Sequence, residues 1–518
     1  MRARSARRAD EGNSVAEAQQ AVAPVSAPQA AAQAAAQAAA SPVTAPNGQT
    51  TQAVAIAPAR PVRVETGPIR TRPPRGRTWL LIAGIAIFAG VLAVYIADLA
   101  NHLSALGQMR DLAVYRAGGL ITRHASPPGN YNHSAGLYSW HGKYRVSFTY
   151  APIAAIIFAG GSLLSWLALR WVMTIISLAA LLLSVWLTFG ALGYPSRRVR
   201  AGAALLVAAA ALVTEPIQQN LALGQINLLL MLLVVMDLTR PRPRWWNGIG
   251  IGLAAGIKLV PLIFIPYLLL TGRFRQAAVA AGTFVATIGI GYAVLPHDSA
   301  HYWQDGTFLN ANRIVFLGTR GNQSLHGLII RFMGSVDGAA HVYLAVAAVV
   351  AIAGLVVAAA LDRAGHPVAG MLGCALTALL VSPLSWDHHW VWAALGVGYL
   401  GHLAVRSRGP ARVGWGLATA ALLAIFGAWP QFWAPGTALT PAGWVWYGPT
   451  QYFAYGDSPH YREYHWNLLQ IIAGNSFILA GLLALAVLAV AAFRLRQPAT
   501  ASVRTSLRNS SRDAARAS

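Results

Sequence analysis

The chain has 518 residues, of which 56% are hydrophobic and only 11% are charged. Soluble domains carry about 25% charged residues, so this composition excludes a protein whose surface faces water throughout. The net charge of +23 is carried largely by arginines in the two tails and in short loops such as Arg197–Arg200 and Arg406–Arg412. This distribution is typical of membrane topology signals and anionic-lipid contact, not of nucleic-acid binding. The single cysteine, Cys374, excludes a disulfide framework and a cysteine-based zinc site.

Long apolar stretches recur along the chain, among them Trp79–Ala97, Ala277–Leu295, Val342–Leu361 and Leu468–Ala492. A helix needs ~20 such residues to cross a hydrocarbon core of ~30 Å. These stretches are apolar on all sides, whereas the helices of a soluble protein are amphipathic. The pattern predicts an all-α fold, a polytopic transmembrane helical bundle of about twelve spans, with extracytoplasmic loops and juxtamembrane helices.

Composition divides the chain into three regions. Residues 1–77 are rich in alanine, glutamine, proline and arginine and are expected to form a disordered basic cytoplasmic tail. Residues 78–493 form the membrane domain, and residues 494–518 form a second basic tail. Because arginine-rich loops stay on the cytoplasmic side, loops 296–340, 382–389 and 430–466 are expected outside, with both termini inside. We therefore expect a multi-pass plasma-membrane protein.

Two apolar regions do not fit simple crossings. Residues 151–192 are long enough for two spans, but two spans there would place Arg197–Arg200 outside. In residues 247–271, Lys258 and Pro261 interrupt a single apolar stretch. A re-entrant piece in the first region and a broken helix pair in the second restore the charge rule. Irregular backbone at membrane depth survives where it faces protein or a wet cavity, so a cavity is expected there.

Asp111 begins the segment Asp111–Leu120, shortly after the first predicted span. As a helix, this segment places Leu112, Tyr115 and Gly119 along one side and could lie in the membrane interface. An acid at a helix N-terminus is stabilised by the helix dipole without any further role. A carboxylate at the water–lipid boundary also suits a general base acting on a hydroxyl.

Only two lysines, Lys143 and Lys258, occur among the 39 Lys and Arg residues. Lys258 stands inside an apolar stretch, where an ionisable side chain indicates function. A lipid phosphate would be a natural partner, and a buried structural ion pair is the alternative. Lys143, in the outer loop, is expected to be solvated.

Polar residues also gather in three short segments between spans, namely Glu215–Asn227, Asn310–Arg331 and Ser382–Trp390. Asp387, His388 and His389 are residue types that bind divalent metals. Adjacent histidines do not share a helical face, however, and no paired metal-binding spacing occurs. Hydrogen bonding to a phosphate or a sugar is the favoured interpretation, and plain loop hydration is the alternative for the middle segment.

Taken in order, these segments resemble glycosyltransferase family 87, the polyprenol-phosphate-sugar-dependent membrane transferases of the GT-C superfamily. The resemblance covers about residues 78–405. The matching pieces are Asp111–Leu120, Gly136-Leu137-Tyr138 with Phe148–Pro152, Gly224-Gln225-Ile226-Asn227, Gly252–Pro261, Asn322-Gln323-Ser324 and Ser382–Trp390.

The resemblance implies a GT-C bundle and an inverting transfer of a sugar, usually mannose, from a polyprenyl-phosphate donor to a lipid-linked glycan of the cell wall. It implies that Asp111 is the catalytic base. The donor's phosphate or sugar is expected to contact Lys258, Arg313, His388, His389, Asn322, Gln225, Tyr115 and Tyr150. No Asp-x-Asp motif is present, so neither a metal nor another cofactor is expected.

Two other functions remain open from the sequence. Relatives within the family transfer arabinofuranose, and the residues do not discriminate between a pentose and a hexose. A lipid or solute transporter or flippase would also have many spans, a broken helix and an intramembrane lysine. The large polar outer loops and the absence of an obvious internal repeat favour the enzyme.

Overall fold

A computed structural model of the chain describes residues 77–101, 109–129, 136–140, 147–240, 244–310, 317–428, 443–447 and 462–496. The predicted tails lie outside these residues, apart from Arg77 and the last three residues of the final helix. Within them the chain is a bundle of helices without a sheet, and its only β-type pairings are two isolated bridges, Thr214 with Gly427 and Asn322 with Trp386. The predicted all-α class is confirmed.

The first half of the bundle contains α2 (Arg77–Asn101), α4 (Arg110–Thr122), α5 (Pro152–Gly161), α6 (Trp166–Ala191), α7 (Arg197–Leu212), α8 (Glu215–Leu223), α9 (Asn227–Leu238), α10 (Ile249–Ile257) and α11 (Phe264–Leu270). The second half contains α12 (Phe274–Val294), α13 (Pro296–Trp303), α14 (Leu325–Met333), α15 (Val336–Arg363), α16 (Pro367–Val381), α17 (Ala393–Arg406), α18 (Gly409–Phe426), α19 (Leu468–Gly474) and α20 (Ser476–Arg496). Short 3₁₀ helices include η3 (Val260–Ile263), η4 (Thr307–Leu309), η6 (Asp387–Trp392) and η7 (Trp444–Trp446).

Six of the described helices, α2, α6, α12, α15, α18 and α20, are long and apolar enough to cross a membrane. The pair α8 and α9, bent by 115° at its break, makes a seventh if it is one span, and three shorter apolar stretches accompany them. The polytopic architecture is therefore supported, whereas the expected total of about twelve spans is not confirmed. The expected final span is also divided, because α19 and α20 are separate helices on either side of Asn475.

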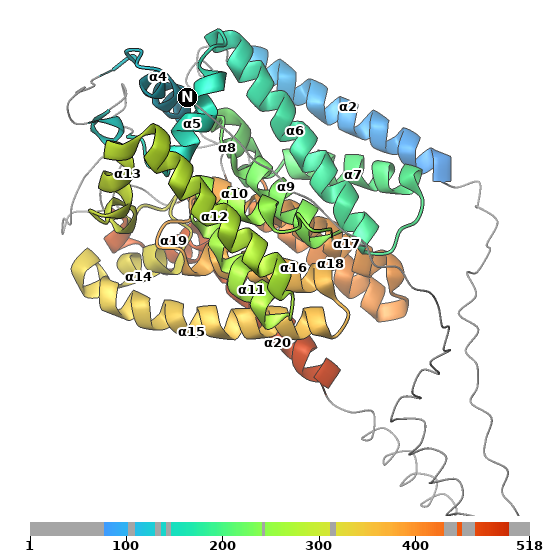
Figure 1. Ribbon diagram of the computed structural model, residues 1–518. Coiled ribbons are helices and arrows are strands. Elements are labelled where there is room, and N and C mark those ends of the chain that lie inside the picture. Colours follow the sequence, from blue (N-terminus) through green and yellow to red (C-terminus); the bar gives the residue numbers. More distant parts are fainter. Residues whose placement is uncertain are drawn as a thin grey trace, which may run out of the picture. The chain divides into compact units, whose positions relative to one another are not determined.

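The two irregular regions are each divided into separate helices. Residues 151–192 contain a short helix, α5, and one long helix, α6, which alone carries the chain from one end of the bundle to the other (Figure 1). The stretch 247–271 is broken at Lys258, whose extended backbone ends α10 before η3 and α11 begin. Lys258 is thereby placed at an interruption in the helix, where its side chain can reach polar partners.

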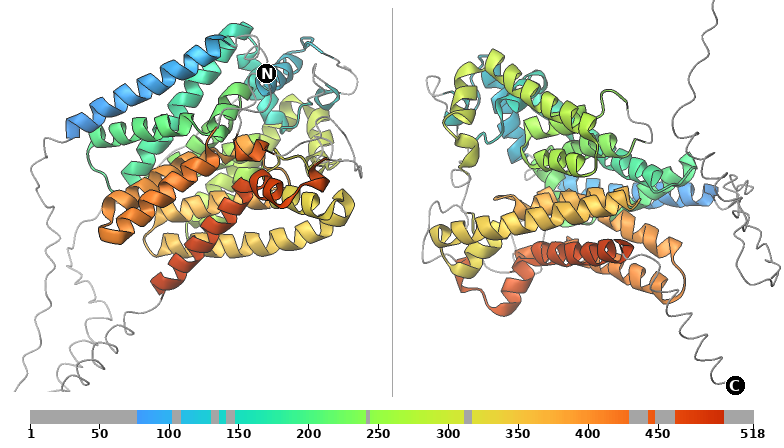
Figure 2. Two further views of the ribbon diagram at one scale, coloured as in Figure 1. Left: turned by 180° about the vertical axis from the view of Figure 1, so that it is seen from behind. Right: turned by 60° about the horizontal axis from the view of Figure 1, so that its bottom comes forward.

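The helices are arranged so that the short elements gather at one end. The start of α2 and the end of α20 lie toward the same end of the bundle, and α4, α13 and α14 lie at the other (Figures 1 and 2). Small residues allow helices to approach closely inside the bundle. A Cβ added to Gly84 of α2, for example, would come within 2.9 Å of the Gly202 carbonyl oxygen of α7. Many large apolar side chains, such as Trp79 and Ile82 of α2, remain exposed, as expected for surfaces that face lipid.

Candidate active site

Asp111 lies in the first turn of α4, a helix that packs into the bundle instead of lying on its surface. Leu112 and Tyr115 are fully buried. Gly119 allows α4 to contact α5 closely, because any Cβ there would collide with the backbone of Phe158. Asp111 itself is only half-buried. The packing of α4 therefore holds a partly accessible carboxylate in a fixed position.

Gln225 is hydrogen-bonded to the Asp111 carboxylate and fixes its position. It stands at the break between α8 and α9, where Gly224 adopts a left-handed conformation (φ +67°) and closes α8. Its Nε2 donates a short hydrogen bond to Oδ2 of Asp111. Its Oε1 accepts hydrogen bonds from the hydroxyls of Tyr115 at 2.9 Å and Tyr150 at 3.1 Å. The two tyrosines fix the orientation of the amide, so the Nε2 donor faces the carboxylate.

Lys258 lies in the same network through Asn227 and His389. Its Nζ is 2.9 Å from Oδ1 of Asn227 and 2.7 Å from Nε2 of His389. The backbone N–H of Trp386 donates to Nδ1 of His389 at 3.2 Å. A neutral imidazole that accepts a hydrogen bond at Nδ1 carries its proton on Nε2. Nε2–H of His389 can then donate a hydrogen bond to Nζ of Lys258 when Lys258 is a neutral amine.

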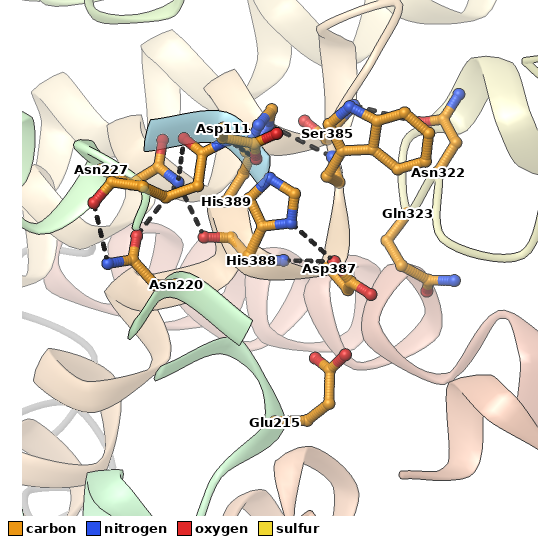
Figure 3. Close-up of polar contacts among 12 residues, drawn as sticks. Asp111, Glu215, Asn220, Asn227, Asn322, Gln323, Ser385, Asp387, His388 and His389 are labelled. Carbon is orange, nitrogen blue, oxygen red and sulfur yellow. Dashed lines mark hydrogen bonds and ion pairs between the residues drawn. The ribbon is translucent and has the colours of Figure 1, made fainter. Parts of the chain in front are cut away.

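His388 is oriented by the residue before it. Oδ1 of Asp387 accepts from the backbone N–H of His388 at 2.7 Å and lies 3.0 Å from its Nδ1. The other ring nitrogen, Nε2, is buried and has no hydrogen-bond partner among the described residues. The His388 ring lies between Asp387 and Asp111, as Figure 3 shows. An imidazole held in this way presents a free nitrogen to the site.

Asn322 borders the site and joins two loops. Its side-chain oxygen accepts from the backbone N–H of Ser385, and its amide nitrogen donates to the carbonyls of Leu317 and Pro383. The side chain is fully buried. In this arrangement Asn322 fixes the loop that carries Asp387, His388 and His389.

Burial alters the protonation of the groups at the site. Burial raises the pKa of the Asp111 carboxyl, although the hydrogen bond from Gln225 opposes the shift. Burial also lowers the pKa of His389 well below its ordinary value, which keeps this ring neutral. The site thus combines a carboxylate of increased basicity with neutral nitrogen donors, an arrangement that can remove a proton from a hydroxyl and hold a phosphate.

The structure brings together most of the residues expected to form the site. Asp111, Tyr115, Tyr150, Gln225, Lys258, His388 and His389 form one network, with Asn322 at its border. Arg313 and Lys143 lie outside the described residues. Sequence reasoning gave no role to Glu215, which is buried behind Asp387, or to its hydrogen-bond donor Trp446. Nothing in the sequence of the 430–466 loop indicates that it supplies this contact.

Comparison with known proteins gives matches of one kind. Residues 148–383 match the model of glycosyltransferase family 87. The polyprenol-phosphate-mannose-dependent alpha-(1-2)-phosphatidylinositol mannoside mannosyltransferase of Mycolicibacterium smegmatis is 32% identical over 390 residues, which cover 71% of this chain and 80% of the relative. The chain belongs to glycosyltransferase family 87.

Two further relatives are from Mycobacterium tuberculosis. A polyprenol-phosphate-mannose-dependent alpha-(1-2)-phosphatidylinositol mannoside mannosyltransferase is 32% identical over 298 residues, 56% of this chain and 68% of the relative. The corresponding pentamannoside mannosyltransferase is 34% identical over 284 residues, 53% of this chain and 63% of the relative. No solved structure gives a significant match.

The family 87 match covers only part of the site. Tyr150, Gln225 and Lys258 lie within the matched residues, whereas Asp111 lies before them and His388 and His389 lie after them. Membership of a glycosyltransferase family identifies the chain as an enzyme and decides against the transporter alternative. The roles of Asp111, His388 and His389 must therefore be inferred from their positions in the structure.

Proposed function

We propose that this enzyme transfers mannose from a polyprenyl-phosphate donor to a lipid-linked glycan, with Asp111 as the general base. The observation that carries the proposal is the half-buried Asp111 carboxylate, held by Gln225 beside Lys258 and two histidines. The relatives are named for a polyprenol-phosphate-mannose donor and for phosphatidylinositol mannoside acceptors. We propose the same donor and acceptor classes here.

The reaction follows from the chemistry of these groups. Asp111 removes the proton of an acceptor hydroxyl as its oxygen attacks the anomeric carbon. The bond from that carbon to the phosphate oxygen breaks, and its electron pair leaves with the polyprenyl phosphate. A single displacement of this kind needs one base and inverts the anomeric centre. Lys258 and His389 lie where nitrogen donors would stabilise the phosphate as its charge increases.

Replacing the base tests the catalytic assignment. Asp111→Asn keeps the shape of the side chain but cannot accept the proton, and it should lower transfer about 100- to 10,000-fold. The assay uses purified protein in nanodiscs, radiolabelled polyprenyl-phosphate mannose and a phosphatidylinositol mannoside acceptor. Asp305→Asn, at an exposed acid, is the matched control and should remain active. Full transfer by a folded Asp111→Asn protein would show that Asp111 is not the base.

We also propose that both termini are cytoplasmic and that the site lies outside. The common end of α2 and α20, opposite α4 and α13, supports this orientation (Figure 1). Cys374 is the only cysteine, so a Cys374→Ala background permits labelling of introduced cysteines. In intact cells a membrane-impermeant maleimide should label Leu309→Cys, in η4, and not Val405→Cys, near the end of α17, both of which are exposed. The reverse pattern would contradict the orientation. Reaching about twelve spans would require further helices, including shorter ones, to cross as well.

A further inference from the structure

Glu215 is an acid buried at a place where no function has been assigned to it. It begins α8, is fully inaccessible to solvent, and packs behind the loop that carries His388. Its Oε1 accepts a hydrogen bond from Nε1 of Trp446 at 2.8 Å. Its Oε2 is buried and receives no hydrogen bond from a donor in the described residues. A buried carboxylate oxygen without a donor is costly, so this atom requires an explanation.

The neighbour of Glu215 is a second carboxyl group. Asp387 lies within hydrogen-bonding reach of Glu215, and Figure 3 shows the two side chains facing each other. Two buried carboxylates in contact cannot both be ionised, because like charges repel strongly when water is excluded. One proton therefore resides between Glu215 and Asp387.

Hydrogen bonding decides which oxygen carries the proton. Oδ1 of Asp387 accepts from the backbone N–H of His388 and lies 3.0 Å from Nδ1, so a proton on Nδ1 gives Asp387 a second N–H donor. Glu215 accepts only from the Trp446 indole. Because each N–H donor favours the ionised form, Asp387 keeps the negative charge and Glu215 carries the proton. Oε2 of Glu215 then acts as a donor to Asp387, which accounts for its lack of any other partner.

We propose that Glu215 is a positioning residue that donates a hydrogen bond to Asp387 and thereby holds His388 with Nδ1 protonated and Nε2 free. This inference rests on the proposed function and adds a route for the proton. After Asp111 has taken the proton of the acceptor hydroxyl, that proton passes from its carboxyl oxygen to Nε2 of His388. The resulting imidazolium is balanced by the Asp387 carboxylate and lies beside the newly formed phosphate. The imidazolium then gives this proton to an oxygen of the departing polyprenyl phosphate, so Asp111 regains its charge, His388 returns to its neutral form, and no other reactant is needed.

The other charged and titratable groups facing this unit are Asp111 on α4, Lys258 at the end of α10, His389 on η6, and Arg320, whose guanidinium stacks on the ring of Trp446. Asp111, Lys258 and His389 make no hydrogen bond to Glu215 within the described part of the chain. A change at Glu215 should therefore reach the reaction through Asp387 and His388.

Two substitutions at Glu215 separate this role from a merely structural one. Glu215→Gln retains an acceptor for Trp446 and offers an amide N–H to Asp387, so it reproduces the neutral acid. Its pH–rate profile should match that of the unaltered enzyme. Glu215→Leu removes the donor, which makes Asp387 more basic and favours the imidazolium. The acidic limb of the profile should then move to higher pH by about one unit, because one charge-assisted hydrogen bond is lost.

The measurement is mannosyl transfer from polyprenyl-phosphate mannose between pH 5 and 9, with folding checked by thermal stability. A shifted or inactive Glu215→Gln enzyme would overturn the proposal, because Glu215 would then act as an anion. A uniform fall in the rate of Glu215→Leu at all pH values would also overturn it. If Glu215→Leu does not fold, the pH–rate profile of Glu215→Gln still tests whether Glu215 acts as a neutral donor. Activity of Asp111→Asn tests the proposed function separately.

Discussion

Replacement of Gln225 by methionine should change how the activity depends on pH. Gln225 donates to the Asp111 carboxylate, and its oxygen is held by the hydroxyls of Tyr115 and Tyr150. Methionine preserves the length of the side chain but removes the donor. A hydrogen bond to a charged group contributes about 1.5–3 kcal/mol. Since 1.36 kcal/mol corresponds to one pKa unit, the ionised form of Asp111 loses the equivalent of about one to two units.

The direction follows from which form Gln225 stabilises. The amide N–H binds the ionised carboxylate, so its loss raises the pKa of Asp111, which burial has already raised. Asp111 must be ionised to act as a base. As the pH is lowered, the activity of Gln225→Met should therefore begin to fall at a higher pH than that of the unaltered enzyme. The acidic limb of its pH–rate profile should move to higher pH by about one to two units.

The assay measures kcat/KM for polyprenyl-phosphate mannose from pH 4.5 to 9 in nanodiscs. Tyr150→Phe serves as the matched control, because it removes one hydroxyl from the Gln225 oxygen and leaves the donor to Asp111 in place. Its limb should move much less. An unchanged limb in folded Gln225→Met would refute the assignment of the hydrogen bond, of the base, or of both.

Three further predictions concern other parts of the molecule. Calorimetric titration with polyprenyl phosphate, in buffers of different ionisation enthalpy, should show net proton uptake by Lys258, of at most about one proton per site. Lys258→Arg, always charged, should abolish the uptake, and a buffer-independent heat would contradict the assignment. Gly119→Ala should destabilise the protein by about 1–3 kcal/mol, because its methyl group collides with α5, whereas Gly160→Ala, in open space, should cause a smaller loss in a thermal-shift assay. Transfer should persist in EDTA, since the chain lacks an Asp-x-Asp motif; restoration by a divalent ion after inhibition would disprove this.

The sequence predicted most of the long helices because uninterrupted apolar residues leave a chain at membrane depth few alternatives to a helix. The break at Lys258 was predictable for the same reason, since a lysine and a nearby proline interrupt the apolar pattern. The sharp bend between α8 and α9 was not predicted. Gly224 could have indicated the end of α8, but the bond from Gln225 to Asp111, a residue 114 positions away, has no signal in the local sequence.

The site could be predicted in part. Asp111, Lys258 and the adjacent histidines were recognisable as polar residues near apolar segments, and the family resemblance supplied their order. The position of Glu215 was not recognisable, because a buried acid and a solvated loop acid have the same appearance in a sequence. Only the packing of Trp446 and Asp387 around it distinguishes the two.

The assembly of the site from α4, the break between α8 and α9, the end of α10 and η6 has a consequence for biogenesis. The first of these elements begins at Arg110 and the last ends at Trp392, so a ribosome must complete most of the membrane domain before the base and its partners meet. Truncated or wrongly inserted chains should lack the proton-accepting arrangement altogether. Such products should not hydrolyse the activated sugar wastefully, which protects a lipid-bound donor during membrane insertion.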